Sequence, residues 1–199
     1  MIKELLEITS LPDTPAMTAM LETILLLAAV MLTGFLVSTA DNLCVKLLSL
    51  ILGGRPAFLI RNYITWPGTV LHELSHALFA FITGAGIKEI RLFPRGEKLG
   101  SVSIIPRGNL LLRSLQLSLS AVAPVITGLI CLILMWVCIL PGLNKAWHYI
   151  LFWYFFISVF FHMSLSPEDR KNFLSGIIPT AVLIFLIFLV PAFLSSIRL

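Results

Sequence analysis

The chain has 199 residues, of which 58% are hydrophobic and only 12% charged, and its mean hydropathy is +1.00. This balance excludes an ordinary soluble domain and is typical of a polytopic membrane protein. The net charge of +4 comes from basic residues in short polar segments, which suits loops at an anionic membrane surface and does not indicate nucleic-acid binding. Because each crossing takes about 20 apolar residues, the length allows four or five helices in a single membrane-embedded domain, residues 1–199.

The first apolar segment runs from about residue 16 to residue 40, and Asp41 is expected to end it. Residues 43–52 are too few to cross a bilayer, so we expect a separate interfacial or re-entrant helix there. A second span is expected over about residues 63–84. It begins near Pro67, since proline is tolerated in the first turn of a helix.

The segment after the second span changes its hydrophobic period. Residues 87–105 alternate apolar and polar positions on either side of a turn at Pro94 to Gly96, which predicts a β-hairpin. Three more spans are expected over about residues 114–140, 145–165 and 176–196. The sequence therefore predicts an all-α membrane protein with about five transmembrane helices and one small hairpin.

Basic residues set the expected orientation in the membrane. Residues 85–113 contain six Lys or Arg and two Glu, so the positive-inside rule places this segment in the cytoplasm. By alternation, the second and fourth spans then end on the same side. Since no organelle-addressing signal is evident, we expect a multi-pass protein of a prokaryotic plasma membrane.

Within the second span, His72, Glu73 and His76 form an H-E-x-x-H box. Positions i and i+4 share a helix face, so both imidazoles can reach one metal ion with Glu73 beside it. Glu73 is the only acidic residue between Ile64 and Gly84. An ionisable side chain near the bilayer centre costs about 2.5–3.5 kcal/mol, which favours a functional role for the box over a chance occurrence.

A catalytic zinc ion takes three protein ligands and keeps one position for water, so the two histidines need a third ligand. The candidates at the mouth of a later span on the expected side are His162, Glu168 and Asp169. We expect Asp169, because a short carboxylate binds zinc well and Pro167 restrains its approach. Two other interpretations stay open: the Ser-Pro-Glu-Asp run also fits a capped helix start, and His162 also fits a packing role.

These residues resemble the site-two protease family of intramembrane zinc metalloproteases. In that family a transmembrane H-E-x-x-H box is followed by a cytoplasmic β-hairpin, and an aspartate from a later helix completes the zinc site. Residues 121–124 with Gly128 are similar, more loosely, to a small-residue and proline element of the helix after the hairpin. The family's second ligand motif has an asparagine and prolines ahead of Leu-Asp-Gly. Residues 162–170 differ from this motif and keep only its aspartate. The resemblance covers about residues 66–176 and is that of a small, divergent member.

The resemblance implies a zinc-dependent intramembrane endopeptidase that cleaves transmembrane protein substrates. It implies that His72, His76 and Asp169 hold the zinc ion. It also implies that Glu73 is the general base that activates the attacking water. The hairpin, particularly residues 99–105, offers a strand edge to an unwound substrate segment.

Two other functions stay open. The first is a catalytically silent, zinc-binding membrane scaffold that binds a partner protein. The second is an ion-translocating protein, which is less favoured because the chain shows no internal repeat. Asn109 and His162 are the candidates for oxyanion stabilisation, and both a gating partner and a homo-oligomer are compatible with the sequence.

Overall fold

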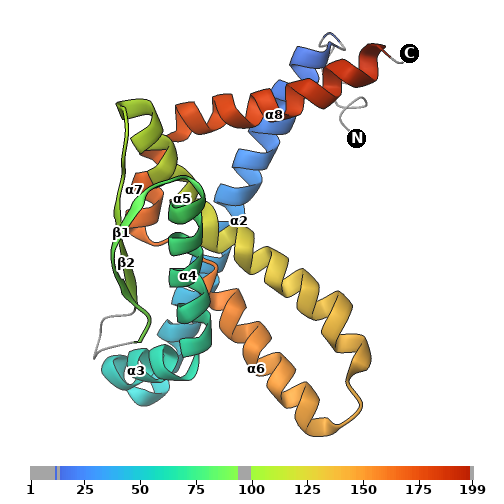
Figure 1. Cartoon of the computed structure of the whole chain (residues 1–199). Helices are drawn as coiled ribbons and strands as arrows, with labels where there is room; N and C mark the ends of the chain where they lie inside the picture. The colour runs from blue at the N-terminus through green and yellow to red at the C-terminus, as the bar shows by residue number, and fades with distance from the viewer. Residues whose placement is uncertain (1–11, 13, 94–99, 198–199) are drawn as a thin grey trace.

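The computed structural model describes residue 12, residues 14–93 and residues 100–197 (Figure 1). In chain order the elements are α2 (Pro15–Leu52), α3 (Gly54–Ile64), α4 (Trp66–Ile82), β1 (Gly86–Arg91), β2 (Ser101–Ile105), α5 (Leu110–Leu134), the π-helical η1 (Met135–Ile139), the 3-10 turn η2 (Leu140–Gly142), α6 (Ala146–His162), α7 (Pro167–Ser175) and α8 (Ile177–Ile197). The expected mainly helical fold with one small hairpin is confirmed.

Three helical units in the described residues are long and apolar enough to cross a membrane: α2, Leu110–Gly142 and α8. A fourth is added if α6 and α7, which are bent by 54° at a short break, form one interrupted span. Helix α4, which carries the H-E-x-x-H box, has 17 residues and lies at the short end of the range of about 17–25 that a crossing needs. A membrane protein is thus supported, whereas the expected count of about five spans is not confirmed.

The first helix is longer than expected. Helix α2 continues through Asp41 to Leu52, so the separate interfacial helix expected over residues 43–52 was wrong. Asp41 does not end the helix because its carboxylate pairs with the guanidinium of Arg61 on α3. The two contacts are 3.1 Å from Nε to Oδ1 and 2.6 Å from Nη2 to Oδ2. Such a bidentate pair neutralises the charge within the helical segment.

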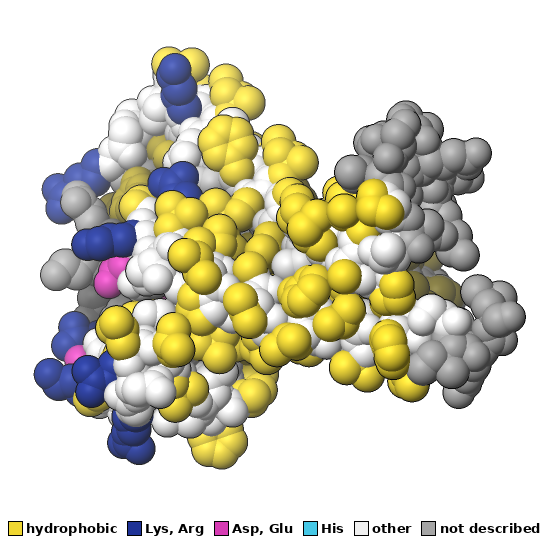
Figure 2. All heavy atoms as spheres, turned by 90° about the horizontal axis from the view of Figure 1, so that it is seen from above, with side chains coloured by type: hydrophobic (Ala, Val, Ile, Leu, Met, Phe, Trp, Pro, Cys, Tyr) yellow, Lys and Arg dark blue, Asp and Glu magenta, His cyan; other side chains and the backbone are white. Residues whose placement is uncertain are grey.

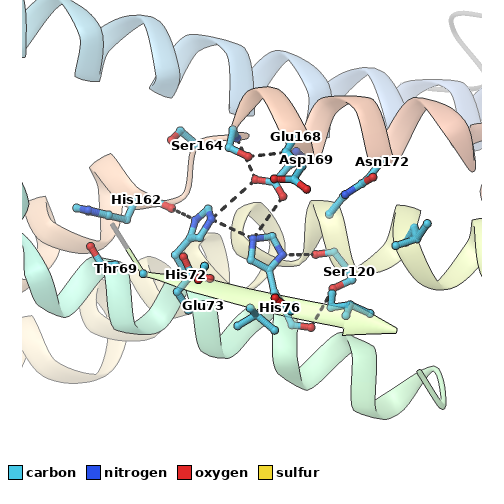
Figure 3. A pocket seen from close by; sticks show the side chains of 18 of the residues that line it. Thr69, His72, Glu73, His76, Ser120, His162, Ser164, Glu168, Asp169 and Asn172 are labelled. Carbon is cyan, nitrogen blue, oxygen red and sulfur yellow. Dashed lines mark hydrogen bonds and ion pairs between the residues drawn. The ribbon is translucent and has the colours of Figure 1, made fainter. Parts of the chain in front are cut away.

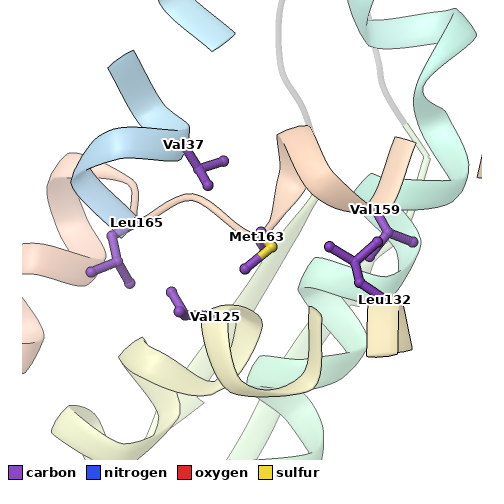
Figure 4. Close-up of a cluster of buried hydrophobic side chains, with 6 residues drawn as sticks. All are labelled: Val37, Val125, Leu132, Val159, Met163 and Leu165. Atoms are coloured by element: carbon purple, nitrogen blue, oxygen red, sulfur yellow. The ribbon is translucent and has the colours of Figure 1, made fainter. Parts of the chain in front are cut away.

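Helix α4 lies at the centre of the fold, between the hairpin on one side and α5 and α6 on the other (Figure 1). Helix α7 packs against α5, and α2 packs along α8. One buried hydrophobic cluster joins α2, α5, α6 and the segment between α6 and α7 (Figure 4). Its members are Val37, Val125, Leu132, Val159, Met163 and Leu165. Burial of Met163 and Leu165 fixes the short connection that leads into α7.

Large hydrophobic side chains cover much of the outside of the molecule. Phe35, Ile51 and Trp136, for example, are each 52–80% exposed. Figure 2 shows hydrophobic side chains over most of one face, with Lys and Arg gathered along one edge. Apolar exposure on this scale marks an interaction surface. Here it suits contact with lipid, in agreement with the apolar composition.

Helices α4 and α6 approach each other closely at Gly68. A Cβ added there would lie 2.0 Å from the carbonyl oxygen of Ser158, so only glycine permits this packing. The Gly68 N–H donates to the Ser158 hydroxyl at 2.8 Å, and that hydroxyl donates to the Thr65 carbonyl at 2.9 Å. These contacts bring the end of α6 directly over the helix that carries the box.

The hairpin expected over residues 87–105 is present, with its two strands antiparallel and Gly86 opposite Ile105. The turn expected at Pro94 to Gly96 lies outside the described residues. Phe93, beyond β1, stacks on Trp66, the first residue of α4, with ring centroids 5.2 Å apart. The hairpin therefore runs back along α4 and covers one of its faces.

A buried glutamine on α5 anchors the hairpin to its neighbours. The Gln116 side chain accepts a hydrogen bond from the Arg107 N–H at 2.7 Å and donates to the Thr83 carbonyl at 3.0 Å. Gln116 itself is only 1% exposed, and both bonds are partly buried. One side chain thus ties the end of the hairpin to the end of α4.

We expect Gln116→Leu to loosen the hairpin, because the substitution removes the hydrogen bonds to the Arg107 N–H and the Thr83 carbonyl, each worth about 0.5–1.5 kcal/mol. Hydrogen exchange in detergent should rise over residues 100–107, and the melting temperature should fall. The control is Thr39→Val, which removes an exposed hydroxyl on α2 and should change neither. Unchanged exchange in Gln116→Leu would show that the hairpin is held by other contacts.

Candidate metal centre

The two histidines of the box lie one turn apart on α4 and are each oriented by a backbone carbonyl. Nδ1 of His72 lies 2.6 Å from the carbonyl oxygen of His162, and Nδ1 of His76 lies 2.8 Å from that of Ser120. A carbonyl oxygen only accepts, so both Nδ1 atoms carry a proton and donate. In the neutral rings both Nε2 atoms therefore present lone pairs, and these two atoms are 3.0 Å apart.

Asp169 of α7 faces the two imidazoles (Figure 3). Its Oδ1 lies 3.4 Å from Nε2 of His76, and its Oδ2 lies 3.8 Å from Nε2 of His72. A reciprocal capping box fixes the carboxylate: Ser166 N–H donates to Asp169 Oδ2 at 3.0 Å, and Asp169 N–H donates to Ser166 Oγ at 3.1 Å. The helix-cap interpretation of Asp169 and its placement at the histidines therefore both hold.

The three side chains fit a zinc ion. Their ligand atoms all lie within 4.8 Å of one another. Ligand atoms at zinc bond lengths of about 2.0–2.1 Å in a tetrahedral site are about 3.3 Å apart, and two of the separations here are 3.0 and 3.4 Å. Two imidazoles and a carboxylate are zinc's usual ligands. The carbonyls on Nδ1 are the outer partners that orient histidines at metal centres.

The three side chains line a cavity of about 610 Å³ that also contains Glu73. Glu73 is 6% exposed and lies under the hairpin. A Cβ added at Gly100 would lie 2.7 Å from Cγ of Glu73, and the backbone of Val102 approaches the Glu73 carboxylate. The Glu73 side chain is thus confined between its own helix, α4, and the hairpin residues around β2. It lies in the same cavity as the three side chains.

The three candidates for the third ligand occupy different positions. Asp169 is the one brought to the Nε2 atoms, while Glu168 lines the cavity from an exposed position. The backbone carbonyl of His162 contacts His72. The ring Nδ1 of His162 contacts the carbonyl oxygen of Ser158 within α6. Asn109, a candidate for oxyanion stabilisation, instead caps the start of α5 and is not among the residues that line the cavity.

Several residues around the cavity were not singled out in the sequence. Ser120 acts through its backbone carbonyl, which has no side-chain signature. Gly100 matters through a close approach that only the tertiary fold creates. Thr69 precedes Glu73 by four positions, so helical spacing alone would have placed it on the same face. Residues 121–124, part of the family resemblance, are buried, and Ala121 lines the cavity.

Comparisons with protein-family models, with curated proteins and with solved structures find no match to this chain. The functional assignment therefore depends on the motif and on the geometry of this cavity.

We expect the purified protein to bind one zinc ion per chain and to lose it in His76→Ala and in Asp169→Ala, because each substitution removes one of the three ligands. Metal content after dialysis, measured by mass spectrometry, checks this. Glu168→Gln is the matched control, since it changes the neighbouring carboxylate in the same cavity and should keep the zinc. Full zinc content in Asp169→Ala, or its loss in Glu168→Gln, would contradict the ligand set.

Proposed function

We propose that this protein is an intramembrane zinc metalloendopeptidase of the site-two protease type, which hydrolyses peptide bonds of transmembrane substrates. One observation carries the proposal: two Nε2 lone pairs and the Asp169 carboxylate converge in a cavity that also holds the buried Glu73. Three such ligands with an adjacent carboxylate are the components that H-E-x-x-H hydrolases use. The motif offers two of the proposed ligands, and the nearness of Asp169 to both Nε2 atoms supports it as the third.

The residues around the cavity have distinct roles in the proposed reaction. A zinc ion held by the three ligands would act as a Lewis acid, lowering the pKa of a coordinated water to about 7 and polarising the scissile carbonyl. Glu73 takes the proton from the attacking water and passes it to the leaving amine. The backbone carbonyls of His162 and Ser120 keep the imidazoles in the tautomer that presents Nε2 to the cavity.

Strand β2 is the proposed platform for the substrate. A peptide bond in a transmembrane helix is hydrogen-bonded within that helix, so the substrate has to unwind before attack. Residues 100–104 line the cavity, and in the described part of the chain β2 pairs only with β1. Its other edge can therefore accept an extended segment as an added strand, which would hold a peptide bond in the cavity.

The proposal includes a multi-pass position in a prokaryotic plasma membrane, with about five crossings and with residues 85–113 on the cytoplasmic side. The apolar outer surface supports the membrane position. The excess of basic residues in 85–113 supports the orientation. Helix α4, at 17 residues, is long enough to count as a crossing only in a thin or locally thinned bilayer.

We expect Glu73→Gln to reduce cleavage by at least about 100-fold while zinc stays bound, because the amide cannot accept the proton of the attacking water. A suitable probe is an internally quenched fluorescent peptide whose apolar helix is interrupted by Gly-Pro and so unwinds readily. The assay compares wild type and Glu73→Gln in detergent micelles, with metal content measured on the same samples.

Glu168→Gln serves as the control and should cleave at the wild-type rate, since it changes an exposed carboxylate at the cavity rim. Cleavage by Glu73→Gln at the wild-type rate would refute the role of Glu73. A wild-type protein that binds zinc and cleaves no probe would instead be a zinc-binding membrane scaffold.

A further inference from the structure

Asn172 of α7 contributes an unused carboxamide to the wall of the cavity. The side chain of Asn172 forms no hydrogen bond with the described residues, and the Ser175 hydroxyl bonds only to its backbone carbonyl. The residue is partly exposed, and its amide nitrogen and oxygen are not among the buried atoms that lack a partner. Both atoms are therefore accessible from the cavity. A carboxamide offers donors and an acceptor at one place.

The helix itself does not explain an asparagine at this position. Asn172 lies inside α7, beyond the residues that cap its start. Asparagine is less favourable there than alanine or leucine, because its side chain competes for backbone hydrogen bonds. Among the described residues that line the cavity, Asn172 is the one carboxamide. An accessible, unpaired polar group at a position that favours an apolar residue indicates contact with a ligand.

Asn172 lies close to the candidate metal ligands. It follows Asp169 by three positions, so the two side chains share one face of α7 with their Cβ atoms about 5–6 Å apart. In Figure 3, the helix that carries Asp169 and Asn172 and the strand β2 lie on opposite sides of the two imidazoles. Both walls belong to the same cavity. A peptide segment added to the edge of β2 would therefore have its second edge toward α7.

The backbone of an extended segment matches this arrangement. The N–H and the C=O of one residue in a strand point to the same side, and the next residue points to the opposite side. Residues that face α7 would thus recur every two positions, about 6.6 Å apart. This spacing is similar to the separation of Asp169 and Asn172 along their helix. When one residue presents its carbonyl to the metal ligands, the next residue facing the same way is near Asn172.

We propose that the Asn172 carboxamide binds the substrate backbone on the edge opposite β2, a role that rests on the proposed protease function. Its NH₂ group donates to the carbonyl oxygen of one substrate residue, and its oxygen accepts from the N–H of that same residue. The extended segment is then hydrogen-bonded on both edges, to β2 and to α7. Because the contact uses only backbone atoms, it selects an unwound segment with a free N–H and not a particular side chain.

Asn172→Ala and Asn172→Leu are the central test. Both residues form helices better than asparagine does, and the free protein loses no hydrogen bond, so the melting temperature should stay the same or rise. In the zinc-loaded Glu73→Gln background, the Kd of the quenched Gly-Pro peptide should increase about 10- to 30-fold in both variants, as expected for two lost hydrogen bonds. In the active enzyme, KM should increase and kcat should change less.

A peptide series identifies the bond directly. Replacing one backbone N–H at a time by an ester oxygen, at each residue around Gly-Pro, removes a donor without adding bulk. At one position the ester should raise the Kd about fivefold when Asn172 is present and have no further effect in Asn172→Leu. Esters that face β2 should raise the Kd equally in both proteins. The control is Lys171→Ala, which changes an exposed neighbour on α7 that does not line the cavity and should leave every Kd unchanged.

An unchanged Kd in Asn172→Ala and Asn172→Leu would refute the contact, as would an ester series in which no position depends on Asn172. Loss of zinc or a lower melting temperature in both variants would also overturn it, because the carboxamide would then have a structural role. Absence of cleavage by the wild type refutes the proposed function instead. Peptide binding to the Glu73→Gln protein still decides the contact in that case, and failure to bind refutes it.

Discussion

The structure depends on one electrostatic constraint: two imidazole lone pairs and a carboxylate are held within a few ångströms of each other inside an apolar protein. Carbonyl groups on Nδ1 of His72 and His76 keep the protons away from the facing Nε2 atoms. Bases that face one another in this way repel unless a cation lies between them, and the repulsion is strong in a low-dielectric interior. Facing bases of this kind favour a cation between them, which is the physical basis of the proposed zinc site.

Each neighbour of α4 contributes one part of this arrangement. Helix α5 supplies the Ser120 carbonyl, α6 supplies the His162 carbonyl, and α7 supplies Asp169. The capping box that starts α7 also fixes the Asp169 carboxylate, so a feature that stabilises the helix by about 1 kcal/mol also orients the proposed third ligand. The hairpin closes the remaining side over Glu73. The polar cavity is thus lined by elements that each contribute one part of the site.

Sequence patterns predicted those features of the protein that depend on the spacing and order of residues along the chain. Helical spacing placed His72 and His76 on one face, alternation placed the hairpin, and the topology of the spans selected Asp169. The errors arose where a distant partner decides the outcome: Asp41 stays helical because Arg61, twenty residues away, neutralises it. The backbone carbonyls that orient the two imidazoles depend on how the helices pack. No pattern in the amino-acid sequence records them.

X-ray absorption at the zinc K-edge tests the central claim most directly. We expect the zinc-loaded protein to show a four-coordinate first shell of nitrogen and oxygen at about 2.0–2.1 Å, with outer-shell scattering from two imidazoles and no sulfur. A sulfur ligand at about 2.3 Å, or a shell without imidazole scattering, would place the metal away from His72 and His76 and contradict the account.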